Sequence, residues 1–396
     1  MIAEPDVDLD FPRATAGDIA VINLESARQQ SWSRFWQAPE REGIAEYIVE
    51  QEQMTLQFLS DTGALDRLDG LVQQLVRVGA EPMRTTLIQA QVAATTHRFA
   101  EARDFLQMAE IHGGPSESAK RLLLSVDQAC GNRLDEVLET RRRMAVESGR
   151  LEDLVPLGAL LADLGEFDEA DYIYQRALKE YQDVSPFALA WVCFQLGVLW
   201  GELVPETQAS RAAEWYRKAI AFVPCYVKAR VHLAEIYLRD ERAEHAEALL
   251  IPVVSNGDPE VSWRLADLMV AKEKFAEGEA HLEAARTGFE ALLEKHLLAF
   301  ADHGAEFYSG SGKDAERAFE LAKINLENRP TLRAFEQAYE TAVGAGRSKA
   351  ASEVLNAAEK RWGTTSAFGL SPLAVRCRGF SWSSRSRTEQ PHDVQS

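Results

Sequence analysis

The residues best suited to chemistry are Asp302, His303 and Glu306, which lie close together in the chain. Two carboxylates and an imidazole could bind a metal ion or transfer protons near neutral pH. Alternatively, the three side chains cap helices, form ion pairs and line a binding surface. The histidines of this region, His281, His296 and His303, have neither HExxH spacing nor a cysteine–histidine ligand spacing. The sequence therefore favours the second interpretation.

No other motif indicates catalysis or a cofactor. Residues 310–313 read GSGK, but they lack the GxxxxGK[ST] spacing and a preceding strand, and no GxSxG motif occurs. The four cysteines show no CxxC spacing, and two of them lie in apolar helical stretches, where a free thiol acts as a small hydrophobe. We therefore predict a protein without metal or cofactor that is not an enzyme.

The charge balance disfavours two classes of partner. The 62 acidic and 43 basic side chains give a net charge of −19. Nucleic-acid binding depends on neutralising phosphates with Lys and Arg, and anionic membrane surfaces likewise attract basic segments. We therefore expect neither nucleic acid nor membrane as a partner. The acidity either keeps the chain soluble or accelerates its encounters with basic partners.

The ends and the apolar runs indicate where the protein resides. The N-terminus is acidic and lacks the basic and apolar regions of a signal peptide. We also find no apolar run that reaches the length needed to span a bilayer. Together with the unpaired cysteines, these features predict a cytoplasmic protein.

The elements that must position these residues are helices with an internal repeat. Apolar positions recur at helical spacing, and a set of small, aromatic and alanine residues returns about every 34 residues. The clearest copies contain Leu157, Gly158, Gly165, Ala170, Tyr174 and Ala177; then Leu196, Gly197, Ala212, Tyr216, Ala219 and Pro224; then Leu233, Ala234, Tyr237, Ala246, Leu250 and Val253.

This pattern resembles the tetratricopeptide repeat, in which each unit is a pair of antiparallel helices. The resemblance implies an all-α fold, an α-solenoid of about eight to nine tetratricopeptide-type helix pairs that form a right-handed superhelix. Weak copies of the motif and an insertion at residues 201–209 leave the repeat count at eight or nine.

The composition divides the chain into three parts. Residues 1–42 are predicted to be an irregular acidic N-terminal arm, residues 43–363 the solenoid, and residues 364–396 a flexible C-terminal tail rich in Ser and Arg. The alternative for the tail is that its apolar residues dock as a cap on the last helix pair. These residues are Phe368, Leu370, Leu373 and Val375.

The resemblance also implies where a partner binds. Members of the family usually hold a peptide or helix in a concave groove lined by the first helix of each pair. The matching groove positions are Trp191, Phe194, Lys228, Glu235, Arg239, Trp263, Asp267 and His303. The asparagines of the carboxylate-clamp variety are missing, since Val231 and Glu235 stand at those positions. Trp191 and Trp263 are either peptide-stacking anchors or core residues between repeats.

We therefore predict a non-enzymatic adaptor or scaffold that binds a protein or peptide in its groove. This prediction is an inference from fold resemblance. The alternatives are a regulatory sensor that binds a small ligand or a transcription factor, and an enzyme or enzyme-accessory subunit that uses Asp302, His303 and Glu306. The sequence predicts neither the partner nor the oligomeric state.

Overall fold

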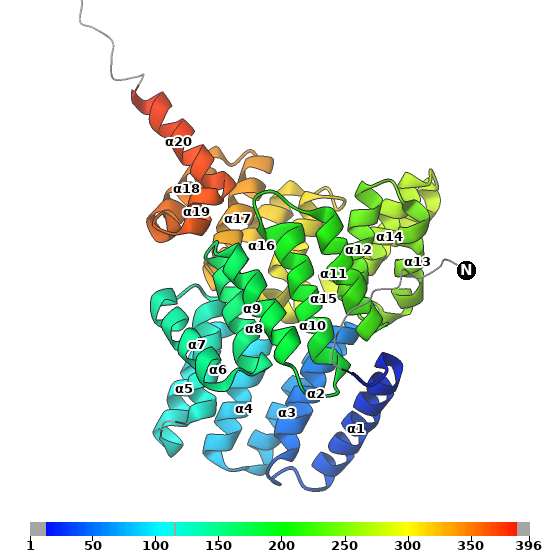
Figure 1. Ribbon diagram of the computed structural model, residues 1–396, viewed down its shortest axis with the longest axis vertical. Helices are drawn as coiled ribbons and strands as arrows, with labels where there is room; N and C mark the ends of the chain where they lie inside the picture. Colours follow the sequence, from blue (N-terminus) through cyan, green and yellow to red (C-terminus); the bar gives the residue numbers. More distant parts are fainter. Residues whose placement is uncertain (1–12, 115, 386–396) are drawn as a thin grey trace, which may run out of the picture. The chain divides into compact units, whose positions relative to one another are not determined.

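The computed structural model describes residues 13–114 and 116–385, which are helical and contain no β-strand (Figure 1). The elements are α1 (Gly17–Gln37), α2 (Ile44–Leu59), α3 (Gly63–Val78), α4 (Pro82–Thr95), α5 (Phe99–Gly113), α6 (Glu117–Ala129), α7 (Leu134–Ser148), α8 (Leu151–Asp163), α9 (Phe167–Glu180), α10 (Pro186–Val198), the π-turn η1 (Leu199–Leu203), α11 (Ala209–Phe222), α12 (Val227–Arg239), α13 (Ala243–Leu250), the 3-10 turn η2 (Ile251–Asn256), α14 (Pro259–Ala271), α15 (Phe275–Ser309), α16 (Ala315–Asn328), α17 (Leu332–Gly344), α18 (Ser348–Trp362), α19 (Ser366–Leu370) and α20 (Pro372–Arg385). The predicted all-α fold is confirmed.

Within the described residues, the helices from Ile44 to Trp362 follow one another as nine consecutive pairs. These pairs are α2–α3, α4–α5, α6–α7, α8–α9, α10–α11, α12–α13, α14 with the first part of α15, the second part of α15 with α16, and α17–α18. The 35-residue α15 serves two pairs because His296 leaves helical geometry, with φ −132° and ψ 50°. Nine pairs lie within the predicted range, and the arrangement is an α-solenoid of the tetratricopeptide type.

In α8–α9 and α10–α11, a contact between a glycine of the first helix and a tyrosine ring of the second holds the two helices together. A Cβ atom at Gly158 would lie 2.7 Å from the Tyr174 ring, and one at Gly197 would lie 2.4 Å from the Tyr216 ring. Both tyrosines are almost completely buried, so neither ring has room to withdraw. The small residue of the repeat therefore makes space for the aromatic ring of the partner helix, because real side chains do not tolerate such distances.

The turns inside several pairs share a backbone geometry. One turn residue adopts a positive φ, and the next N–H donates to the carbonyl five residues earlier, as in the helix-ending motif that usually takes glycine. The residues with positive φ in three successive pairs, His97, Gly131 and Gly165, are each 34 positions apart. Matching bonds run from Arg98 N to Ala93 O, Asn132 N to Asp127 O, Arg242 N to Tyr237 O and Arg347 N to Ala342 O, at 2.7–2.8 Å.

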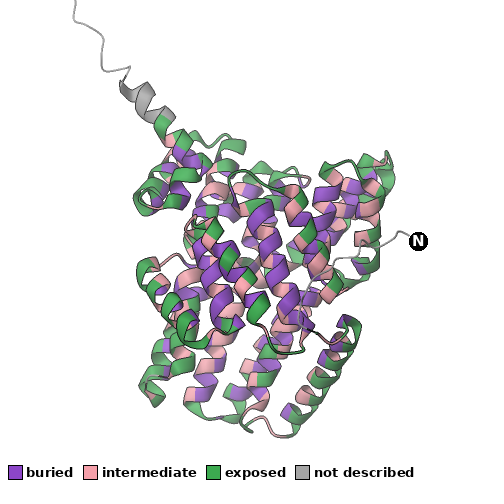
Figure 2. Ribbon diagram, viewed as in Figure 1, coloured by how far each residue is buried: buried purple, intermediate pink, exposed green. Residues whose placement is uncertain are grey.

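The chain folds into two compact units. Unit 1 comprises residues 1–68, 135–162 and 167–256, and unit 2 comprises residues 69–134, 163–166 and 257–396. Figure 2 shows buried positions concentrated along the helices of each pair and exposed positions on their outward sides. Each unit is thus built from segments that are far apart in the sequence.

In unit 1, the chain before the repeats is helical where an irregular arm was expected. That prediction is wrong for α1, which spans Gly17–Gln37. Residues 1–12 lie outside the described residues. The sequence pattern did not indicate this helix because its apolar positions are sparse. Few of its side chains are buried, chiefly Ala20, Leu24 and Phe35. Hydrogen bonds from Arg28 and Trp32 to Glu52 connect α1 to α2 instead.

The buried carboxylate of Glu52 on α2 joins α1, α2 and α3. Its side chain is fully buried, and it accepts hydrogen bonds from Arg28 Nη1 (3.2 Å), Trp32 Nε1 (2.6 Å) and Arg67 Nε and Nη2 (3.0 and 2.7 Å). A buried charge is tolerated only when it is paired and hydrogen-bonded, as this one is.

The end of α2 packs against the starts of α10 and α12 within unit 1. The Phe58 ring lies 4.9 Å from Phe187 and 4.8 Å from Tyr226, and Gln57 Nε2 donates to the Tyr226 hydroxyl at 2.7 Å. The window Pro186–Leu203 in α10 and η1 is long and apolar enough to cross a membrane, so the expectation that no such run exists is wrong. This window is 72% buried within the protein because it supplies core contacts to its neighbours.

In unit 2, the segment after the last repeat is helical rather than a structureless tail. Thr365 caps α19 by accepting from Phe368 N (3.2 Å), and α20 begins at Pro372. Phe368 and Leu373 are buried against α18 and α17, as the capping alternative predicts, whereas Leu370 and Val375 are exposed. The predicted flexible tail is therefore wrong for residues 366–385, and residues 386–396 lie outside the described chain.

A methyl group at Gly197 tests the contact between the small residue and the ring. We expect Gly197→Ala to lower the free energy of unfolding by about 2 kcal/mol, because the Cβ would overlap the buried Tyr216 ring. The control Gly70→Ala places a Cβ in open space on α3 and should raise stability by about 1 kcal/mol. Urea unfolding followed by circular dichroism measures the free energy of unfolding of both variants. Equal changes in the two variants would contradict the proposed contact between Gly197 and the Tyr216 ring.

Removal of the Glu52 charge tests the ionic network. We expect Glu52→Gln to destabilise the protein by about 3 kcal/mol, because two arginines lose their buried counter-charge. Glu353→Gln, which breaks an exposed pair with Lys349, should cost less than about 0.5 kcal/mol. Chemical denaturation measures the free energy of unfolding of both variants. An unchanged free energy of unfolding in Glu52→Gln would refute the role of this network in anchoring α1.

Candidate partner-binding face

The predicted groove residues belong to different units and differ in burial. Trp191, Phe194, Lys228, Glu235 and Arg239 lie in unit 1. Phe194 is only 7% exposed, and its ring lies 5.7 Å from Tyr216, 5.3 Å from Tyr226 and 5.2 Å from His232. The groove assignment is therefore wrong for Phe194, because neighbouring aromatic rings enclose its side chain.

The remaining residues of this set in unit 1 do not form a shared site. Lys228 Nζ lies 3.5 Å from Gln57 Oε1, so the protein's own α2 occupies the space beside it. Trp191 and Glu235 are half-buried, and Arg239 is exposed at the end of α12. Their role in binding stays a prediction.

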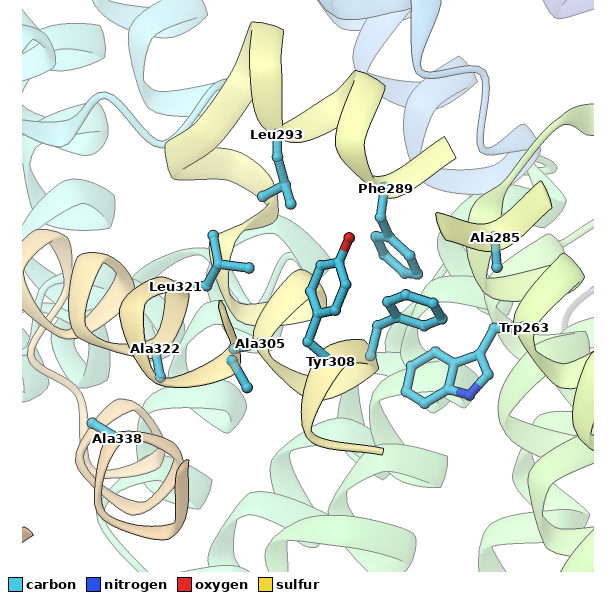
Figure 3. Packing of buried hydrophobic residues seen from close by; sticks show 11 residues of the cluster. Trp263, Ala285, Phe289, Leu293, Ala305, Tyr308, Leu321, Ala322 and Ala338 are labelled. Carbon is cyan, nitrogen blue, oxygen red and sulfur yellow. The ribbon is translucent and has the colours of Figure 1, made fainter. Parts of the chain in front are cut away.

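In unit 2, Trp263 belongs to the core. It is 4% exposed, and its ring packs edge-on against Phe307 at 5.4 Å and Phe289 at 6.3 Å. Figure 3 shows Trp263, Phe289 and Tyr308 gathered between α14 and α15, with Leu293 and Leu321 beyond them. The core alternative holds for Trp263, and its assignment as a groove residue is wrong. The Arg264 guanidinium covers the ring at 3.7 Å.

Above this core, charged side chains of α14 and α15 pair with one another. His303 Nδ1 donates to Glu260 Oε1 (2.5 Å), and Arg264 lies 3.5 Å from Glu306 and 3.6 Å from Asp267. Asp267 also accepts from the Ser311 hydroxyl at 2.7 Å. We define the polar face as Glu260, Arg264, Asp267, Asp302, His303 and Glu306. The predicted residues Asp267 and His303 are thus brought together.

Asp302 is held at the edge of the polar face by α16 and α17. Its carboxylate pairs with Arg329, and its backbone carbonyl accepts from Gln337 Nε2 at 2.8 Å. Arg329 Nε donates to Asn325 Oδ1 (2.8 Å), which fixes the guanidinium. Desolvation raises the pKa of Asp302, but the charges of His303 and Arg329 outweigh it and hold this pKa well below its usual range. Asp302 is therefore a carboxylate at neutral pH.

The side chains of Asp302, His303 and Glu306 all take part in ion pairs. Each of the three pairs with a different partner, namely Arg329, Glu260 and Arg264. Among the residues that the structure describes, no group of three or more His, Cys, Asp or Glu side chains is placed to hold a metal ion.

The charges of the polar face do not balance. Its four carboxylates are accompanied by the guanidinium groups of Arg264 and Arg329 and by one imidazole. Exposure rises along the helices, from 19% for the Glu260 side chain to 42% for His303 and 62% for Glu306. The accessible end of the polar face is therefore acidic.

Sequence reasoning missed one residue of this region, His97 in the turn between α4 and α5. Asn328 Nδ2 donates to the His97 carbonyl at 2.9 Å. Desolvation lowers the pKa of the His97 imidazole from its usual 6.5 to about 4; the charges of Arg329 and His303 also lower it, whereas Asp302 and the Leu298 carbonyl oppose the shift. The available signal was a histidine at the turn position where Gly131 and Gly165 stand in the next two repeats.

Comparison with known proteins gives structural similarity only. No protein-family model and no curated protein matches the sequence. The chain is similar to a Rap protein complexed with competence and sporulation factor (14% identity, TM-score 0.46, 81% of this chain and 99% of that chain). It is also similar to the apo form of the quorum sensor NprR from B. thuringiensis, with 14% identity, a TM-score of 0.42, and coverage of 87% of this chain and 97% of that chain. A third similar structure is the APC/C hetero-tetramer Cut9-Hcn1, with 12% identity, a TM-score of 0.44, and coverage of 88% of this chain and 66% of that chain.

The low pKa of His97 predicts a pH dependence of stability. Because the folded state holds this imidazole neutral, the unfolded state binds more protons between pH 6.5 and 4, and stability falls as the pH drops through that window. We expect the wild type to lose about 2 kcal/mol relative to His97→Gln between pH 7 and pH 5.

Urea unfolding of both proteins at several pH values measures this difference. The comparison with the variant is needed because Glu336 also titrates in this range, since burial raises its pKa to about 7. Parallel stability profiles for the two proteins would show that His97 is not held neutral.

Proposed function

We propose that this protein is a non-enzymatic adaptor that binds a segment of a partner protein on the polar face. The observation that carries the proposal is the set of ion pairs between α14 and α15, Glu260–His303 and Arg264–Glu306, which fixes charged side chains on two rigid helices. Binding by groups already held in place costs less conformational entropy than binding by free side chains.

The charge of the polar face supports a basic partner segment. The two most exposed carboxylates are Glu306 and Asp267, with side-chain exposures of 62% and 36%. Opposite charges at the rim of an interface steer encounters and select partners more than they add affinity. A segment rich in Lys or Arg complements this rim, whereas an acidic segment is repelled.

The core beneath supports the same proposal. The rings of Trp263, Phe289 and Phe307 fill the space between α14 and α15, so the positions of the charged groups above them are set by packing. No observation favours the alternatives of a small-ligand sensor or an enzyme-accessory subunit, which stay predictions from the sequence.

Selection of a displayed random-peptide library on the full chain tests the proposal. We expect the selected peptides to be enriched in Lys and Arg. The double variant Asp267→Asn/Glu306→Lys should bind them about 10-fold more weakly, because each exposed charge contributes roughly 0.5–1 kcal/mol. Fluorescence anisotropy with a labelled selected peptide measures the affinity.

The matched control is Glu353→Lys, which reverses an exposed carboxylate on α18 that pairs only with Lys349 in the described ion pairs. This control should bind like the wild type, and circular dichroism should show unchanged helix content in both variants. Peptides without basic enrichment, or equal affinity for the double variant and the control, would rule out the polar face as the binding site.

A further inference from the structure

The sequence contains a single Asn–Gly pair, Asn256–Gly257, and both of its residues are exposed. Asn256 is the last residue of η2, and Gly257 follows it with a φ of +76°. Apart from its chain neighbours, no atom of the described residues lies within 4 Å of where a Cβ atom on Gly257 would stand. Only residues 257 and 258 separate η2 from α14, so the pair opens a short, unpacked linker.

The side-chain amide of Asn256 caps the end of α2 within unit 1. Asn256 Nδ2 donates to the Leu59 carbonyl at 3.1 Å. Leu59 is the last residue of α2, and Ser60 leaves the helix with a φ of +52°. The last four carbonyls of a helix have no partner inside the helix, and they carry the negative end of its dipole. The Asn256 amide therefore supplies a hydrogen-bond donor where α2 needs one.

An asparagine followed by glycine can react with its own backbone. The Gly257 nitrogen attacks Asn256 Cγ, since glycine has no side chain that hinders the approach. As the new N–C bond forms, the Cγ–Nδ2 bond breaks, and the Gly257 N–H proton leaves with the amide nitrogen as ammonia. Water then opens the five-membered imide at either carbonyl, which yields aspartate or isoaspartate. Water is the only co-reactant, and no oxidant or reductant takes part.

We propose that Asn256 is a site of spontaneous deamidation, and that this modification uncaps the end of α2. The product carboxylate has no N–H to donate, and its negative charge faces the Leu59 carbonyl at the negative end of the helix. Isoaspartate also lengthens the main chain by one methylene at the residue where the chain passes from unit 1 to unit 2. The inference goes beyond partner binding and does not depend on the polar face.

No other asparagine of the chain combines these features. The remaining ones do not precede a glycine, and all but Asn132 lie in helices, namely Asn23, Asn325, Asn328 and Asn356. In a helix the next backbone N–H points along the axis to a carbonyl of the preceding turn and away from the side chain.

The chain also has one Asp–Gly pair, Asp69–Gly70, which could close the same ring by expelling water. This pair lies inside α3, and the Asp69 carboxylate accepts from Arg98 at 2.8 Å. It therefore serves as an internal reference for a reactive sequence that the fold protects.

Peptide mapping by mass spectrometry, after incubation of the full chain at mildly alkaline pH, tests the modification. We expect Asn256 to deamidate at least about 10-fold faster than any other asparagine, because only its neighbour lacks a side chain. An isoaspartate-specific methyltransferase should label residue 256 of the aged protein and not residue 69. Asn256→Gln should remain unlabelled, since its longer side chain closes the larger ring slowly. Deamidation of Asn256 no faster than that of Asn132 would overturn the proposal.

Hydrogen exchange tests the consequence for α2. Asn256→Asp reproduces one product, and Ser255→Asp is the matched control, because it adds the same charge at an exposed neighbour and keeps the Asn256 amide. We expect amide exchange in residues 56–60 to be about 5-fold faster in Asn256→Asp than in the wild type, since the end of α2 loses its cap. The control should exchange like the wild type.

The two readouts address separate steps. Fast deamidation together with equal exchange in Asn256→Asp and Ser255→Asp would refute the capping role of the amide. Neither measurement involves Asp267 or Glu306, so a failure of the proposed function would leave this inference standing, and the reverse also holds.

Discussion

The close contact between a glycine on the first helix of a pair and a tyrosine ring on the second constrains the central helix pairs α8–α9 and α10–α11. At Gly158 and Gly197, a tyrosine ring lies where a Cβ atom would stand. This contact sets the distance between the two helices, and the positive-φ turn sets the angle at which the chain returns. Helix pairs that recur about every 34 residues need no single large core, because each pair packs on its neighbours.

The packing of the pairs decides where polar groups are placed. Side chains on α14 and α15 that cannot enter the core of Trp263, Phe289 and Phe307 lie above it, close enough to form ion pairs between the helices. Because those pairs hold the side chains in one arrangement, the acidic end of the polar face is prepared for a basic ligand.

The predictions that failed have identifiable physical causes. Helix α1 was expected to be irregular because charged contacts around Glu52, rather than a broad apolar stripe, hold it in place. The segment after Gly363 has a composition typical of a tail, yet Ala367, Phe368, Leu373 and Ala374 are buried and dock it on α17 and α18. Trp263 has the character of a binding anchor in the sequence, and only the structure shows the rings that enclose it.

The sequence alone determined the repeat and its helix pairs, because these depend on local spacing and on residues such as Gly158 and Gly197, where only a small residue fits. It also determined that Asp302, His303 and Glu306 are neighbours. The tertiary structure decided their partners, since Arg329, Glu260 and Arg264 come from other turns or helices. It also decided that Asn328 donates to the His97 carbonyl, because a contact between residues 231 positions apart depends on the packing of many helices, which no local pattern records.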